Sequence, residues 1–230
     1  MSSIDFPEAV SKEATAALNE GLRALQDALR TPELETALEK GLPAGFVEAM
    51  ERWWAAYDRY TSVVSEALEV TCTRGCHFCC LDNPTGVSGV ELLWVLRSLP
   101  EDLDGAAAEP AARFEGAIEQ WGSVEQAQRL VKANLDPCMY LQDGQCRVYA
   151  GRPIACRMFF SITQPYRCDP AFPGEATNPK LEPPQVLKEL LKAISHRLGL
   201  SGLPGDLRRG MAALEADETL RRPGSPRRPG

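Results

Sequence analysis

"TCTRGCHFCC", residues 71–80, contains half of the cysteines of this chain, and the other half follow between residues 138 and 168. The full set is Cys72, Cys76, Cys79, Cys80, Cys138, Cys146, Cys156 and Cys168. Cysteines that served only as small core residues would be scattered through the apolar positions of the chain. These cysteines are instead confined to segments rich in Gly, Pro, Asp and Asn, the residues of turns. Their grouping indicates that the thiols act together.

Amphipathic helices are predicted on both sides of the cysteine segments. Before residue 70, apolar residues recur at spacings of three and four, and the longer helix there carries Trp53 and Trp54. We expect both tryptophans to be core residues rather than a ligand platform, because they lie on an apolar helical face. Ser88 and Glu91 form a capping-box pattern that begins a helix ending near Pro100. Further helices are expected over 109–133, 186–198 and 205–220.

The composition is that of a globular protein, with 230 residues, of which 44% are apolar and 25% charged. The formal net charge of −7 argues against nucleic acid as a partner, although the last ten residues carry four arginines and no acid. No apolar stretch approaches the length of a membrane span, and residues 1–20 lack the pattern of a secretory signal. We therefore expect a cytoplasmic protein without a membrane partner, in which thiols stay reduced.

Reduced cysteines grouped in this way are typical of metal sites. Cys76-x-x-Cys79 has the spacing at which one tight turn points two sulfurs at one ion. No βαβ pattern surrounds it, which weakens a thioredoxin-like interpretation. The adjacent pair Cys79 and Cys80 leaves three alternatives open: the two thiols bind different metals, the site is polynuclear, or one of them is not a ligand. His77 is a candidate replacement for a thiol. Thiolates favour zinc and iron–sulfur clusters over magnesium or calcium, but do not separate zinc from iron.

The second cysteine segment reverses the acidic balance of the chain. Residues 138–168 contain one acidic residue and four arginines, Arg147, Arg152, Arg157 and Arg167, and Arg74 lies in the first segment. Guanidinium groups beside a metal with four thiolates would offset its negative charge and donate hydrogen bonds to sulfur. We expect Arg152 or Arg157 to face the thiolates, and Pro153 to fix the turn that leads to Cys156. The alternative is that the arginines form ordinary surface pairs.

On these residues the chain resembles the YkgJ-type cysteine-cluster family, a zinc- or iron-chelating domain. "CTRGCHFCC" (72–80) is similar to the opening of the family pattern, C-x(2,3)-C-x2-C-C. "CMYLQDGQCRVYAGRPIACR" (138–157) is similar to its second part, and "RCD" (167–169) to its trailing cysteine. The resemblance covers about residues 71–170 and leaves the flanking helices unexplained. It implies metal binding by Cys72, Cys76, Cys79, Cys80, Cys138, Cys146, Cys156 and Cys168.

Together these observations predict a mainly α protein with little or no sheet, in which a loop-rich cysteine-cluster metal site is inserted between helices. We expect four parts: an N-terminal helical region (1–70), the cysteine-cluster domain (71–170), C-terminal helices packing on the same core (171–220), and a disordered basic tail (221–230).

The expected function is binding of zinc or iron, including an iron–sulfur cluster, through thiolates from residues 72–80 and 138–168. One family relative, the flagellin lysine methylase, is associated with methyl transfer to protein lysines, so a metal-dependent enzyme is one alternative. The chain has no Gly-rich loop between a strand and a helix that would give it a methyltransferase signature of its own. A thiol-redox sensor is another alternative. The sequence identifies no catalytic residue, and it leaves a protein partner open.

Overall fold

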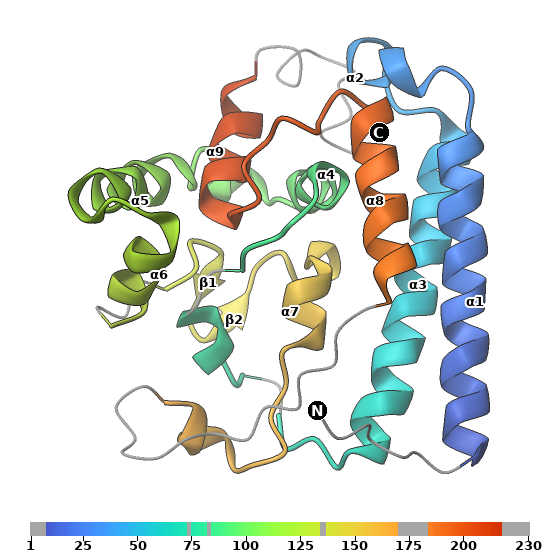
Figure 1. Cartoon of the computed structure of the whole chain (residues 1–230), viewed down its shortest axis with the longest axis horizontal. Helices are drawn as coiled ribbons and strands as arrows, with labels where there is room; N and C mark the ends of the chain where they lie inside the picture. The colour runs from blue at the N-terminus through green and yellow to red at the C-terminus, as the bar shows by residue number, and fades with distance from the viewer. Residues whose placement is uncertain (1–7, 73–74, 82–83, 134–136, 170–183, 218–230) are drawn as a thin grey trace.

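The computed structural model describes residues 8–72, 75–81, 84–133, 137–169 and 184–217, without the side chains of 130–133 (Figure 1). Its two longest helices, α1 (Glu8–Arg30) and α3 (Ala44–Ala67), lie side by side and run in opposite directions. A 3₁₀ turn, η1 (Leu34–Thr36), and the short helix α2 (Ala37–Lys40) connect them. This helical pair is the scaffold against which the rest of the chain packs.

The two long helices approach most closely at Gly21. A Cβ atom at this position would lie 2.8 Å from the Trp53 ring, which is too close for any side chain, so glycine is required. Trp53 is fully buried and Trp54 is 4% exposed. The prediction that both tryptophans belong to the core is therefore confirmed.

Helix α4 (Gly89–Arg97) is buried on all sides along residues 89–96, as expected for a helix with the sequence GVELLWVL. It contacts both α8 (Gln185–Arg197) and α9 (Leu207–Ala216), and α8 also packs on α1. One hydrophobic core joins these helices to α3. The predicted capping box is present, because the backbone N–H of Ser88 donates to Oε2 of Glu91 at 2.8 Å.

The prediction of a single helix over 109–133 is wrong. The segment forms two helices, α5 (Ala108–Trp121) and α6 (Val124–Ala133), and the turn η3 (Glu101–Leu103) precedes them. Gly122 has a φ of 78° and its N–H closes α5 on the Ile118 carbonyl at 2.8 Å. Ser123 then accepts a hydrogen bond from the Gln126 N–H at 3.2 Å, so its side chain starts α6.

Short elements fill the region between α6 and α3 (Figure 1). The strands β1 (Leu141–Gln142) and β2 (Gln145–Cys146) form an antiparallel hairpin. Its turn residues Asp143 and Gly144 both have positive φ angles, 50° and 72°, as Asp-Gly hairpin turns require. The remaining elements are η2 (Phe78–Leu81), η4 (Tyr149–Gly151), α7 (Ile154–Met158) and η5 (Pro165–Cys168).

The fold is mainly α, as predicted, and the hairpin supplies the only strands in the described part of the chain. Among the same residues, no helix combines the length and the apolar character that crossing a bilayer would take. The expected disordered tail (221–230) and Arg74 lie outside the described residues.

Candidate metal centre

All eight cysteines lie in the described residues, and none of them forms a disulfide. Cys72 is exposed and the other seven are partly buried. They are carried by the short elements rather than by the long helices: η2 holds two of them, and β2, α7 and η5 hold one each. The three others lie in the connections that flank these elements, so the cluster depends on loops and turns for its position.

The two cysteine segments meet in space. The backbone N–H of Cys138 donates to the carbonyl of Cys80 at 2.6 Å. The hairpin turn also lies against the first segment, since a Cβ atom at Gly144 would be 3.7 Å from Nδ1 of His77. The sequence separation between the segments is therefore closed by direct contact, and the thiols of η2 face the neighbourhood of β1 and β2.

Cys156 is positioned by the start of α7. Pro153 precedes the helix with a φ of −65°, and its carbonyl accepts the N–H of Cys156 at 3.0 Å. The N–H of Ile154 donates to Oε1 of Glu91 at 2.9 Å, which fixes α7 to α4. Glu91 is buried, and burial raises the pKa of its carboxyl group against the opposing effect of these hydrogen bonds. The expected turn at Pro153 is thus present, and Glu91 is an anchor that the sequence did not identify.

Arg157 faces the helical scaffold. Its side chain is 2% exposed and pairs with Asp58 of α3. Its Nη2 donates to the Ala150 carbonyl at 2.6 Å, and its guanidinium lies 4.6 Å from the centre of the Trp54 ring. These contacts satisfy the cation inside the core. Arg157 therefore docks α7 on α3 and is not the arginine to expect at the thiolates.

Arg152 lies among the thiols instead. It stacks 3.5 Å above the Tyr149 ring. Burial raises the pKa of Cys146 and of Cys156, and the positive charge of Arg152 opposes that rise at both. The difference between the two arginines follows from α7: residue 152 precedes the helix, whereas residue 157 is carried by it onto α3. Arg147 is directed elsewhere, with Nη2 at 3.1 Å from Asp102.

Three thiols form a partly buried group beside Cys79. Burial raises the pKa of Cys138 to about 12, and the charges of Cys146 and Cys79 raise it further. Burial likewise raises the pKa of Cys156, and the charges of Cys138 and Cys79 act in the same direction. Charge effects of this kind require short separations in the protein interior. In the absence of a metal, Cys138 is a neutral thiol at neutral pH.

A second group of thiols lies nearer the surface. Partial burial of its sulfur raises the pKa of Cys72, as do the charges of Cys79 and Cys168. Burial raises the pKa of Cys76, again with contributions from Cys72 and Cys168. The N–H of Ser161 donates to the sulfur of Cys72 at 3.3 Å, and η5 packs on η2. Sequence patterns did not point to Ser161, which acts through its backbone.

The fit of a metal to these residues rests on the chemistry of the donors. In the described part of the chain, no three His, Cys, Asp or Glu side chains stand close enough together to hold one ion as they are placed. The donor set is nevertheless suited to zinc or iron, since it consists of free thiols with a guanidinium among them. Such a site closes when the metal draws its ligands together.

The remaining candidates have other contacts. His77 stacks on Phe78 with ring centres 5.1 Å apart, and its Nδ1 lies 3.3 Å from the Gly75 carbonyl. Asp82 and Asp136, which lie near cysteines in the sequence, fall outside the described residues.

Comparisons of the chain with protein-family models, with curated proteins and with solved structures found no match.

Proposed function

We propose that the chain binds zinc or iron through the thiolates of residues 72–80 and 138–168, and that the metal holds the middle of the chain in its fold. The observation that carries this proposal is the hydrogen bond from Cys138 to Cys80, because it joins two segments that bring eight free thiols together. The similarity of the cysteine spacing to the YkgJ-type family supports the same function.

A structural role for the metal follows from the size of the elements around it. Between residues 137 and 169, the longest helix has five residues and each strand has two. Elements this short do not repay the entropy of ordering their backbone by themselves. Metal binding supplies folding free energy where the ligand site forms only on folding.

The thiol pKa values favour a metal ligand over a redox sensor. Reactive sensor cysteines have a lowered pKa, because the thiolate is the nucleophile. Here the pKa is raised by burial at Cys72, Cys76, Cys138, Cys146 and Cys156. A metal reverses this situation, since it binds the thiolate and displaces the proton.

The test is metal analysis of the full chain, purified without oxygen or added metal. We expect zinc or iron bound in a defined ratio to protein, with iron giving visible absorption from sulfur-to-iron charge transfer and zinc giving none. Acid-labile sulfide separates an iron–sulfur cluster from iron bound by cysteine alone. Cys138→Ser should lower the metal content, whereas Gln145→Ser, an exposed change next to Cys146, should leave it unchanged. Equal metal content in both variants, or a metal-free wild type that binds neither ion, contradicts the proposal.

A further inference from the structure

We propose that the eight cysteines form two separate metal sites, which differ in accessibility and take one thiol each from the adjacent pair Cys79 and Cys80. The inner site is completed by Cys138, Cys146 and Cys156. The outer site is completed by Cys72, Cys76 and Cys168. The inference deepens the proposed function, on which it rests, by assigning the ligands and predicting different rates of metal exchange.

The first argument is the geometry of the adjacent pair. Cys79 and Cys80 both belong to the 3₁₀ turn η2. With three residues per turn, consecutive side chains of a 3₁₀ helix point about 120° apart. Two sulfurs that diverge in this way are poorly placed to bind one tetrahedral ion. They are well placed to serve two sites on different sides of η2.

The second argument is the environment of the inner thiols. Cys138 and Cys146 pack against the main hydrophobic core. Cys156 lies on α7, which the buried Glu91 holds at its first residue. The inner thiols are thus attached to the rigid part of the molecule, and access of solvent to a metal between them is limited.

A buried cation near the inner thiols supports the same assignment. Arg208 is 1% exposed, and its Nη2 binds Asp206 at 2.6 Å. Its Nη1 has no hydrogen-bond partner among the described residues, which is unusual for a buried guanidinium nitrogen. Burial raises the pKa of Cys138, and the Arg208 charge acts against that rise. An anionic thiolate site beside Cys138 would give this cation a counter-charge.

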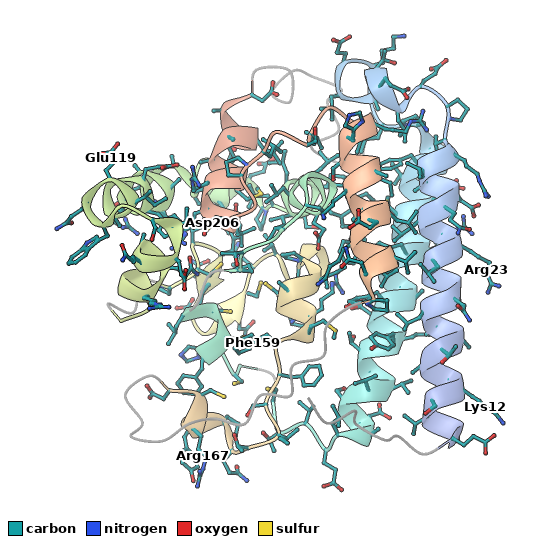
Figure 2. The ribbon with its side chains drawn as sticks, viewed as in Figure 1. Lys12, Arg23, Glu119, Phe159, Arg167 and Asp206 are labelled. Carbon is teal, nitrogen blue, oxygen red and sulfur yellow. The ribbon has the colours of Figure 1, made fainter. Side chains whose placement is uncertain are left out.

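The outer thiols have a different environment. Cys72 is exposed, and Cys168 ends the turn η5, which packs on η2. The chain around them exposes large apolar side chains, including Phe159 and Tyr166. Figure 2 shows Phe159 and Arg167 at the end of the molecule where α3 finishes, away from α4 and α9. A metal at this end would be open to chelators.

The test uses Co²⁺ as the probe, added under reducing, oxygen-free conditions to metal-free full-length protein. Cobalt–thiolate absorption and native mass spectrometry count the bound ions. We expect two Co²⁺ per chain, released to a chelator in two phases that differ at least about tenfold in rate, a difference of the size that outer-shell contacts produce. Cys168→Ser should remove the fast phase and leave the slow one. Cys156→Ser should remove the slow phase, with Cys146→Ser as a second inner variant should Cys156→Ser fail to fold.

Single variants of the adjacent pair sharpen the test. Cys79→Ser and Cys80→Ser should each leave one ion bound, and the ions that remain should be released in different phases. Gln145→Ser should retain both ions. A single Co²⁺ per chain, or loss of all metal in every cysteine variant, overturns the division into two sites but leaves metal binding intact. A chain that binds no metal overturns the proposed function as well.

Discussion

Glu91 accepts a hydrogen bond from the backbone N–H of Ile154 at 2.9 Å, so one buried carboxylate joins α4 to the first turn of α7. The same side chain closes the capping box with Ser88. Because Cys156 lies in α7, this carboxylate connects the folding of the apolar core to the placement of a thiol.

Replacing Glu91 with alanine is expected to lower the free energy of unfolding by about 1–3 kcal/mol, because it leaves buried N–H groups without an acceptor. Urea denaturation followed by circular dichroism measures the change. The control is Glu125→Ala, which removes an exposed i,i+4 pair with Arg129 and should cost about 0.5 kcal/mol or less. Equal stability of the two variants would show that Glu91 is not an anchor.

The contacts of Arg157 predict an effect on stability rather than on metal affinity. Arg157→Gln loses donors to Asp58 and to two backbone carbonyls, so we expect a loss of about 1–3 kcal/mol in the free energy of unfolding. Asp58→Asn should cost less, because the Asp58 carboxylate is 56% exposed and the carbonyl acceptors of Arg157 remain. Metal affinity of the folded Arg157→Gln protein should stay within twofold of wild type. An affinity loss without a stability loss would reverse this assignment.

Arg152 is expected to support the metal directly. Arg152→Gln removes a positive charge near Cys146 and Cys156, and should weaken Co²⁺ binding about tenfold, the lower end of the effects seen for outer-shell partners. Competition with a chelator of known affinity measures the change. Arg147→Gln is the matched control, since Arg147 pairs with Asp102 instead. The prediction fails if the two variants bind Co²⁺ equally well.

Removing the metal should loosen residues 137–169 while the α1–α3 pair and α8 stay folded. The long helices bury their own apolar faces, including Trp53 and Leu191, whereas the short elements depend on the thiols. Hydrogen exchange with and without metal compares the two regions. We expect faster exchange throughout 137–169 in the metal-free protein, restored when metal is added back. Unchanged protection there would mean that the metal is not structural, and would favour a catalytic role.

Much of the helical framework could be predicted from the sequence, because apolar spacing reports which face of a helix is buried. Trp53, Trp54 and the Ser88–Glu91 capping box illustrate this. The break at Gly122 was missed because apolar residues continue on both sides of it, and one left-handed residue was enough to end α5. The Asp143–Gly144 hairpin was missed because its strands are too short to show alternation.

Side-chain direction around the cysteines could not be predicted. Arg152 and Arg157 both lie within five residues of Cys156, and nothing in their spacing separates them. The structure separates them because α7 starts after Pro153 and carries Arg157 onto Trp54 of α3. The second contact of Glu91 was equally hidden, since a capping box predicts its bond to Ser88 but not a bond to Ile154, far along the chain.

The central claim, that these thiols bind a metal, is tested most directly by X-ray absorption at the metal edge of the protein purified without oxygen. The predicted result is a nearest shell of sulfur atoms, about 2.3 Å from the metal for zinc. A nearest shell of nitrogen or oxygen atoms at about 2.0–2.2 Å, or no bound metal at all, would contradict it.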